Sequence, residues 1–353
     1  MATPSSAGNR VRECRQGRGW SQADLARRAG LSRAGVSAIE TDRLVPSVST
    51  ALALAAAFDC QVEALFGSGT GGRAEHEWAW PPAQSPCRYW LAEVRGRTLR
   101  YPAEATAAGV SAHDGVFRAG AAFPAADADP AATLVLASCD PAAGLLAAEY
   151  ARASGYRLLA LPRSGRQALA LLGRGLVHVA GVHFATGGTS AGNERAVREA
   201  VGGGHRLLRV ARWDEGLAVA AAAGVSSVRE AVRADLRWVG REPGSAARQC
   251  LDELRPHGRP PRRVAHDHRG VAEAVRCGWA DAGVCHRLAG EEAGLRVFTV
   301  RREQFDLCYP ADADADPRIA ALVRVVRSAN YRRLAGDLPG CDTTAAGEAW
   351  TVR

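Results

Sequence analysis

The sequence contains no lysine, so all 45 of its basic residues are arginine. This absence excludes a P-loop lysine, a Schiff-base lysine for pyridoxal chemistry and a kinase-type lysine that binds phosphate. The formal net charge is nevertheless +8. Because arginine and alanine are both abundant, as in proteins from GC-rich genomes, the arginine content alone is weak evidence for nucleic acid binding.

Long apolar runs are also missing. No stretch of roughly 18 or more apolar residues is free of charged or small polar residues, so we expect no membrane-spanning helix. Residues 1–18 lack the apolar core of a secretory signal. The nine cysteines have no regular spacing, which predicts reduced thiols rather than a disulfide framework. These features predict a cytoplasmic protein, and 353 residues allow two or three domains.

Residues 1–66 are predicted to form the first domain, an all-α bundle of short helices. Ser21, with Asp24 three residues later, predicts the start of one helix, and Gly30 predicts a left-handed turn at its end. Ser32 then predicts the cap of the next helix, over residues 33–40. Two short helices joined by a turn that contains glycine are typical of a helix-turn-helix.

The same stretch carries a family resemblance. Small, apolar and capping residues fall in register in Ser21-Gln22-Ala23-Asp24-Leu25-Ala26, Gly30-Leu31-Ser32 and Val36-Ser37-Ala38-Ile39-Glu40. This pattern resembles the lambda-repressor-like (Xre-type) DNA-binding domain over residues 9–66. The resemblance implies that the helix of residues 33–40 enters the major groove of DNA. A small helical domain that binds another protein is the alternative.

The resemblance also implies roles for single residues. Arg33 would bind a guanine edge and Ala34 a thymine methyl group, whereas Gln22 and Arg43 would contact phosphates. The residues expected at the DNA are Gln22, Ser32, Arg33, Ala34, Ser37 and Arg43. Because residues 1–66 hold only eight arginines against six acidic residues, one copy would bind weakly. We therefore expect a homodimer on a two-fold DNA operator.

Residues 67–130 are predicted to be a linker that contains a small β-hairpin. Residues 67–72 form a flexible Gly/Ser stretch; they spell G-x-G-x-x-G, but no helix follows, so no dinucleotide site is expected. Two β-rich runs flank Arg95-Gly96-Arg97, which indicates a hairpin. The aromatic residues between positions 78 and 101 favour core or interdomain packing over a ligand cage.

Residues 131–353 show alternating strands and helices. The first three strands, over residues 133–137, 156–161 and 176–182, predict a βαβαβ unit with buried parallel strands. Similar alternation follows as far as residue 335, with strands expected over residues 207–211, 217–222, 295–300 and 305–309 among others. The segments that carry a resemblance are Ser138-Cys139-Asp140-Pro141 and residues 173–183, 241–248 and 271–283. Their order and spacing resemble the two-lobed α/β fold of type II periplasmic binding proteins, particularly the cytoplasmic molybdate-type domain.

A ligand site is expected at the carboxyl ends of these strands, where open α/β sheets bind ligands. Three expected helix starts lie there, Ser138-Cys139, Ser164-Gly165 and Gly244-Ser245, and helix N-termini favour small anions. Arg241 and Arg248 would add positive charge, or hold the hinge or pair with Glu242 instead. Ordinary capping explains each serine and glycine alone. The candidate ligand-binding residues are Ser138, Cys139, Asp140, Ser164, Gly165, His183, Arg241, Gly244, Ser245 and Arg248.

No metal, cofactor or catalytic site is expected. His266, His268, Cys277, Cys285 and His286 have no metal-binding spacing, although His268 or His183 would line the cleft. The G-x-S-x-G run of residues 188–192 is predicted to be a crossover loop and not a nucleophile elbow.

Three functions follow from this organisation. The preferred one is a ligand-responsive DNA-binding transcriptional regulator that senses a small anion. The resemblance implies molybdate or tungstate, and an organic acid or small metabolite is nearly as well supported. The alternative is an enzyme that acts on a small phosphorylated or cofactor-like substrate, against which the lack of lysine and of a clear nucleophile–base pair argues. A ligand-independent scaffold is the third.

Overall fold

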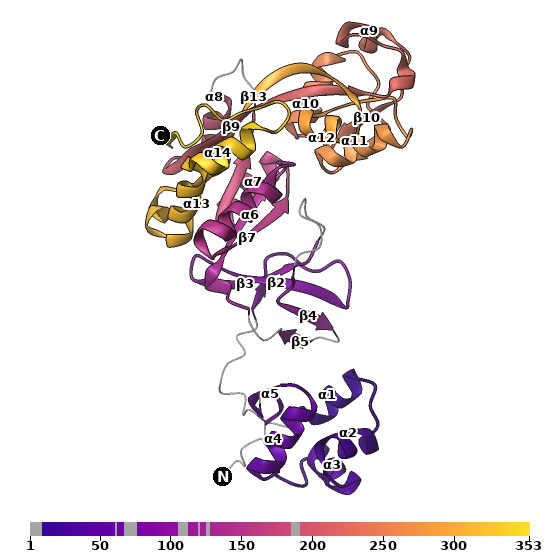
Figure 1. Cartoon of the computed structure of the whole chain (residues 1–353), viewed down its shortest axis with the longest axis vertical. Coiled ribbons are helices and arrows are strands. Elements are labelled where there is room, and N and C mark those ends of the chain that lie inside the picture. Colours follow the sequence, from indigo (N-terminus) through magenta and orange to yellow (C-terminus); the bar gives the residue numbers. More distant parts are fainter. Residues whose placement is uncertain are drawn as a thin grey trace. The chain divides into compact units, whose positions relative to one another are not determined.

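The computed structural model describes residues 9–60, 62–66, 76–104, 112–118, 121–124, 128–184 and 191–353. The chain divides between His76 and Glu77 into two compact units, which are considered separately. Figure 1 shows helices alone in the first unit and both helices and strands in the second. The predicted Gly/Ser linker of residues 67–72 and positions 188–190 of the crossover loop lie outside the described residues.

The first unit is a bundle of short helices around one apolar core. Ser21 and Ser32 cap two helices as predicted, since each side chain accepts a hydrogen bond from a backbone N–H three residues further on. Gly30 has a φ of 67°, so the turn between these helices needs the left-handed conformation that glycine favours. The helices are α1 (Val11–Gly17), α2 (Gln22–Ala29), α3 (Arg33–Glu40), α4 (Val48–Ala57) and α5 (Val62–Phe66).

The second unit begins with a five-stranded sheet, in the order β1-β3-β2-β4-β5. The predicted hairpin is confirmed, with Arg95 and Gly96 at the turn. Trp90 and Tyr101 are buried in the same core as strands and helices beyond residue 130, and the Tyr101 hydroxyl donates to the Leu176 carbonyl. This segment therefore packs as part of the second unit. Its strands are β1 (Glu77–Trp78), β2 (Cys87–Val94), β3 (Arg97–Pro102), β4 (Gly115–Arg118) and β5 (Ala121–Pro124).

A ten-stranded sheet forms the rest of the second unit, with the order β11-β10-β12-β9-β13-β8-β6-β7; β14 and β15 pair with β9. The predicted βαβαβ unit is confirmed, because β6 pairs in parallel with both β7 and β8. The strands are β6 (Thr133–Ser138), β7 (Arg157–Pro162), β8 (Val179–Val182), β9 (His205–Val219), β10 (Trp238–Arg241), β11 (Arg263–Ala265), β12 (Ala282–His286), β13 (Arg296–Pro310), β14 (Cys341–Asp342) and β15 (Ala349–Val352).

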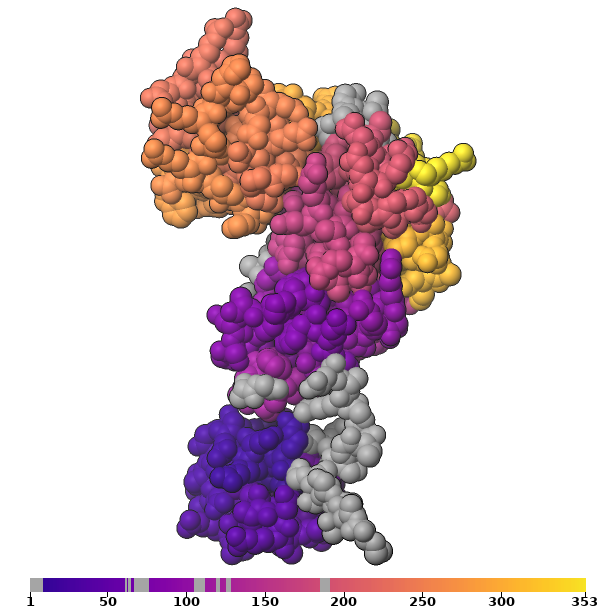
Figure 2. All heavy atoms as spheres, turned by 180° about the vertical axis from the view of Figure 1, so that it is seen from behind, coloured from indigo at the N-terminus to yellow at the C-terminus, as the bar shows by residue number. Residues whose placement is uncertain are grey.

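The helices of this unit divide into two lobes. Figure 1 shows the two lobes joined by the long strands β9 and β13, and Figure 2 shows the second lobe, in orange, as a body distinct from the magenta atoms of the first. The first lobe holds α6 (Ala143–Ser154), α7 (Gly165–Gly173), α8 (Ala191–Val201), α13 (Pro317–Arg327) and α14 (Ala329–Gly336). The second holds α9 (Val228–Arg233), α10 (Ala246–Leu254), α11 (His268–Arg276) and α12 (Arg287–Glu292).

The two long strands correct the sequence prediction. Each has 15 residues and runs without a turn through both lobes. The expected strands were four shorter ones, over residues 207–211, 217–222, 295–300 and 305–309. Between the first two, Glu215 is buried and pairs with Arg301 of β13 at 2.9 Å, so the strand continues through this polar residue. A cross-strand ion pair thus allows charged residues to remain inside a continuous strand.

Candidate functional site

The first candidate site is the amino-terminal end of α3. Ser32, Arg33 and Ala34 are exposed and Ser37 is half-buried, while Val36 on the same helix is buried in the core. Arg43, beyond the end of α3, is also exposed. The sequence therefore folds so that one face of α3 packs inward and the residues expected at DNA bases face outward.

Gln22 lies in a different environment from the one expected of a phosphate contact. Its amide donates a 3.0 Å hydrogen bond to Glu40, which also accepts two hydrogen bonds from Arg15, at 2.6 and 3.0 Å. Burial raises the pKa of Glu40, but the hydrogen bonds from Arg15 and Gln22 outweigh it and leave the pKa below its usual value. In this structure Gln22 thus helps to join α2 to the end of α3.

The second candidate site is a cavity of about 150 Å³ between the two lobes. The first lobe contributes the end of β6 and the start of α6, and the second contributes the start of α11. Among the expected ligand residues, Ser138, Cys139 and Asp140 line it. Its full lining is Ser138, Cys139, Asp140, Pro141, Ala143, Ala160, Pro162, Asp267, His268 and Arg269.

The other two predicted helix starts do not meet there. Of the described residues, Ser164, Gly165, Gly244, Ser245 and Arg248 are not among those that line the cavity. Ser164 forms a capping box in α7, and the Ser245 hydroxyl accepts from the Arg248 backbone N–H in α10. These two serines therefore have the ordinary capping role. The second helix start at the cavity is that of α11, whose first residue is His268.

Both arginines of the predicted site are paired with acidic residues. Arg241 is buried and its guanidinium donates to Glu242 at 2.9 and 3.0 Å, while Arg248 pairs with Asp252 at 2.9 Å. Arg241 still lies close enough to Cys139 and His268 for its charge to act on both. The cavity thus has a buried positive charge beside it, partly neutralised by Glu242.

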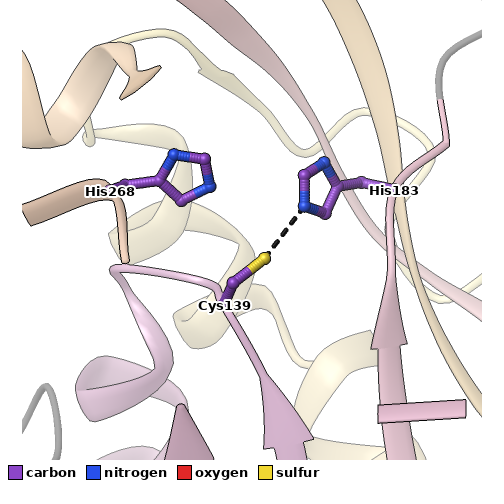
Figure 3. A group of neighbouring side chains, drawn as sticks. All are labelled: Cys139, His183 and His268. Atoms are coloured by element: carbon purple, nitrogen blue, oxygen red, sulfur yellow. Dashed lines mark hydrogen bonds between the residues drawn. The ribbon is translucent and has the colours of Figure 1, made fainter. Parts of the chain in front are cut away.

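Cys139, His183 and Glu303 form a hydrogen-bonded series next to the cavity. The Cys139 thiol lies 2.9 Å from His183 Nε2, and His183 Nδ1 is hydrogen-bonded to the Glu303 carboxylate. Figure 3 shows the first of these bonds as a dashed line. Burial lowers the pKa of His183, but the contact with Cys139 and the charge of Glu215 outweigh it and raise the pKa above its usual value. A thiol hydrogen-bonded to an imidazole that a carboxylate also contacts was not predicted from the sequence.

His268 faces the same point with an unused hydrogen-bond donor. Its Nδ1 accepts a 3.0 Å hydrogen bond from the His286 backbone N–H, so in the neutral ring the proton is on Nε2. That Nε2 is buried and has no hydrogen-bond partner. Burial, followed by the charges of Arg241 and His183, lowers the pKa of His268 well below its usual value, which keeps the ring neutral.

The geometry admits two chemical uses of these three residues. Cys139 Sγ and one ring nitrogen from each of His183 and His268 lie within 4.8 Å of one another, as metal ligands do. A metal ion would need the lone pair of His268 Nε2, and the hydrogen bond from His286 places a proton on that nitrogen. The arrangement therefore favours a ligand that accepts a hydrogen bond.

Sequence analysis missed Glu303 and did not commit to His268. One sequence feature connects Cys139 with His183: each directly follows a strand, β6 or β8, and these two strands are parallel neighbours. Residues at the carboxyl ends of adjacent parallel strands meet at one sheet edge. Glu303 and His268 give no comparable indication, because they come from an antiparallel strand and from the other lobe.

The two units define a class of protein, a helix-turn-helix domain followed by a periplasmic-binding-protein-like domain. The PBP superfamily domain matches residues 147–327, just over half of the chain, and a helix-turn-helix family matches residues 11–65. The chain therefore belongs to the PBP superfamily and has an Xre-type helix-turn-helix domain as its N-terminal domain. Among the described residues, no helix is both long and apolar enough to cross a membrane.

Two curated proteins match parts of the chain. The immunity repressor protein of Bacillus phage phi105 is 42% identical over 65 residues, which are 18% of this chain and 45% of the repressor. The uncharacterized protein YvgK of Bacillus subtilis (strain 168) is 30% identical over 123 residues, which are 33% of this chain and 39% of YvgK. The chain thus spans less than half the length of these relatives.

Solved structures resemble the second unit distantly. An ancestral amino acid-binding protein, a precursor of cyclohexadienyl dehydratase, is 15% identical with a TM-score of 0.44, over 59% of this chain and 95% of its own. An ABC-type phosphate transport receptor from Vibrio cholerae is 12% identical with a TM-score of 0.42, over 59% of this chain and 98% of its own. At scores this low the likeness says nothing about the ligand.

Proposed function

We propose that this protein is a dimeric transcriptional regulator whose helix-turn-helix domain binds double-stranded DNA in the cytoplasm. In this proposal a small anionic ligand, an oxyanion such as molybdate or a small organic acid, binds between the lobes and changes DNA affinity. The observation that carries it is the cavity with a buried, unpartnered hydrogen-bond donor, His268 Nε2, in a chain that also presents an exposed α3. A ligand shifts DNA affinity only by binding the lobes' two arrangements unequally.

The DNA-binding part of the proposal is supported by the position of Arg33. It is exposed at the first turn of α3, where the family's reading residues contact base edges. The test is selection of DNA sequences from a random pool by the full chain, followed by binding assays on the selected sequence. We expect Arg33→Ala to lose the sequence preference and Arg229→Ala, an exposed arginine of the second unit, to keep it. Absence of any selected sequence would refute DNA recognition.

The ligand-binding part is supported by the donors around the cavity. His268 offers a fixed N–H, and Arg269 adds a positive charge at the lining. Burial raises the pKa of Asp140, which also lines the cavity, to about 6, so this carboxyl can hold a proton when an anion approaches. Asp267 also lines the cavity, and Arg269 pairs with Glu292 at 2.7 Å. We propose an anion as the ligand because His268 Nε2, a donor without a partner, can donate to it.

A melting experiment tests this part on the full chain. Molybdate, tungstate, phosphate and small carboxylates are added singly, and a ligand that binds the folded protein raises its melting temperature. We expect the shift produced by the active compound to shrink in His268→Gln and to remain in His257→Gln, a variant of an exposed histidine in the same lobe. Equal shifts in both variants would place the ligand elsewhere.

The dimer is supported by an exposed apolar patch on the first unit, formed by Leu44, Val45, Val48 and Leu52. Val45 is 87% exposed and Val48 is 78% exposed. Apolar side chains gathered on a small domain mark an interaction surface. A second copy is the partner proposed here, because a two-fold operator requires two DNA-binding domains.

The Cys139–His183–Glu303 series is the one observation that favours the alternative, an enzyme. A thiol, a base and a carboxylate that orients the base are the parts of a nucleophilic catalyst. We propose binding without turnover, since a regulator needs the ligand to stay. Release of a product in more than one equivalent per chain would support the enzyme instead.

A further inference from the structure

Anion binding alone does not explain the alignment of Cys139 with His183 and Glu303. We propose that the Cys139 thiol is a nucleophile and that the cavity takes a small carbonyl compound, an aldehyde, which forms a reversible covalent adduct with it. This inference rests on the proposed ligand-binding function and specifies the chemistry of the ligand. It uses four described groups, namely the Cys139 thiol, the His183 ring, the Glu303 carboxylate and the His268 N–H.

The first support is the order of the hydrogen bonds. Glu303 is hydrogen-bonded to His183 Nδ1, which therefore carries the proton, and the lone pair of Nε2 lies 2.9 Å from the Cys139 sulfur. A base within hydrogen-bond reach of a thiol and oriented by a third group is the arrangement that activates a nucleophile. Glu303 is fully buried, with 0% exposure, so water does not compete for His183.

The second support is His268. A thiolate that attacks a carbonyl carbon generates negative charge on the carbonyl oxygen, and a preorganised N–H donor near that oxygen stabilises it. His268 Nε2 is a buried donor without a partner, and a ring nitrogen of His268 lies within 4.8 Å of the Cys139 sulfur. No described group of the protein accepts a hydrogen bond from this donor, so it is available to a ligand.

The cavity limits the size of the ligand. Its volume of about 150 Å³ is similar to that of an engineered cavity that admits benzene, so roughly six non-hydrogen atoms fit. Pro141, Ala143 and Pro162 form an apolar part of the lining. Its charged part is Asp140, Asp267 and Arg269, which also pairs with Glu292 at 2.7 Å. A short aldehyde that carries a carboxylate would place its chain against the apolar part and its charge beside Arg269.

The adduct forms without any further reactant. His183 Nε2 takes the thiol proton, a sulfur electron pair forms the S–C bond, and the C=O π pair moves onto the oxygen. The His268 N–H donates a hydrogen bond to that oxygen while the charge develops. The His183 imidazolium then gives its proton to the oxygen, which completes a hemithioacetal. The reverse sequence releases the aldehyde, so the response is reversible.

Several charged or titratable groups surround His183 and act on this proton transfer. Arg301 pairs with Glu303 at 2.6 Å and with Glu215 at 2.9 Å, so the carboxylate behind the base is held by a cation from β13. The titratable and charged groups that face His183 are Cys139, Asp140, Glu215, Arg241, His268, His286 and Glu303.

The first experiment measures thiol reactivity in the full chain. Limiting iodoacetamide is added at pH 7, and the alkylation rate of each cysteine is followed by peptide mass spectrometry. The exposed Cys60 and Cys277 are internal references. We expect Cys139 to react at least about 10-fold faster than both, and His183→Gln to slow Cys139 alone by about 100-fold, the size of a general-base contribution. Circular dichroism checks that the variant is folded.

Glu303 is a positioning residue and needs a separate readout. Glu303→Gln keeps an acceptor for His183 but removes the negative charge, so we expect the pH–rate profile of Cys139 alkylation to shift while the rates of Cys60 and Cys277 stay unchanged. A purely structural role would change the amount of folded protein and leave the profile in place. An unchanged profile in a folded variant overturns the relay through Glu303.

The second experiment uses ¹³C-labelled glyoxylate, an aldehyde that carries a carboxylate. We expect one new carbon signal of a hemithioacetal per chain. This signal should be absent in Cys139→Ser and should disappear on dialysis.

Equal alkylation rates of Cys139 and the exposed cysteines would overturn the proposal. A Cys139 thiol that reacts only after treatment with a chelator would also overturn it, because that result would indicate a metal site. An oxyanion that raises the melting temperature equally in Cys139→Ser upholds the proposed function and overturns this inference. If only the DNA selection fails, the proposed regulatory function is overturned and the aldehyde inference is not.

Discussion

The two candidate sites differ in how their side chains meet solvent. In the first unit Arg33 and Arg43 stand exposed, whereas in the second Cys139, His183 and His268 are all buried. A large, charged partner such as DNA can bind exposed side chains. A small ligand in a cavity is instead bound by side chains that are buried away from water. Substitutions at the first site should therefore change binding alone, and substitutions in the interior of the second unit should change stability as well.

The largest expected effect is on a buried ion pair of the second unit. Asp306 is fully buried and pairs with Arg209, which is also buried. Asp306→Ala removes the buried carboxylate that pairs with Arg209, which lowers the free energy of unfolding by about 3–5 kcal/mol. Asp314→Ala, which removes an exposed partner of Arg206, lowers it by less than about 1 kcal/mol. Urea unfolding compares the two, and equal losses would contradict the role given to burial.

Acid should unfold the second unit before the first. The first unit holds one histidine, the half-buried His76, whereas the second unit buries His178 and His286, whose pKa values burial lowers to about 4 and about 3. These folded values lie below the unfolded value of about 6.5, so the unfolded chain takes up protons first. Stability is then complete above about pH 6.5 and decreases as the pH falls towards the folded values, by up to about 1.4 kcal/mol per pH unit for each histidine.

A histidine variant checks this pH dependence. His178→Gln removes one of the two groups, so the free energy of unfolding of the second unit should depend less steeply on pH between 6.5 and 4. Urea titrations at several pH values measure the slope. His257→Gln, which changes an exposed histidine, should leave the slope as it is. An unaltered slope in His178→Gln would show that this ring is not neutral when buried.

The exposed site gives a smaller effect, confined to binding. Arg33→Ala should cost about 1–3 kcal/mol of affinity for the selected DNA and remove a base preference, because a bidentate contact to guanine is lost. Arg43→Ala should weaken binding to all sequences and reduce its salt dependence. Fluorescence anisotropy at several salt concentrations separates these outcomes, with the melting temperature expected to remain constant. A change in melting temperature would place Arg33 in the core.

The apolar patch should give the smallest effect on the isolated chain. Val45→Asp should weaken the dimer without changing the fold, because a carboxylate on a buried apolar interface loses its hydration. Sedimentation velocity over a range of concentrations measures the association. Val264→Asp, at a valine of the second lobe that is 47% exposed, is the matched control. Equal association in both variants would place the dimer contact elsewhere.

The sequence predicted the first unit better than the second because its determinants are local. Ser21, Gly30 and Ser32 specify two helices and their turn within a dozen residues, and the structure confirms each. The exposed face of α3 then follows from the helical period. The buried side of the same helix, where Gln22 and Arg15 converge on Glu40, depends on contacts across the bundle and was not predicted.

The cavity could be predicted only in part, for a physical reason. Ser138, Cys139 and Asp140 were expected because they follow a buried strand, and they line the cavity. Glu303 was not, since it is separated by 120 residues from its partner His183. The prediction of two separate strands in place of β9 was wrong for the same reason, because the residue that pairs with Glu215 is Arg301, 86 positions further along the chain.

One detail of β9 marks the boundary between the two lobes. Its neighbour on one side changes from β14, last paired at Trp213, to β12, first paired at Glu215. On the other side the register of β13 shifts between Thr299 and Arg301, at the same level. Both strands thus change their pairing along one line, between the two lobes. Glu215 on this line shares Arg301 with Glu303, and Glu303 is hydrogen-bonded to His183, so a ligand beside Cys139 would bind next to the ion pairs that link the two long strands.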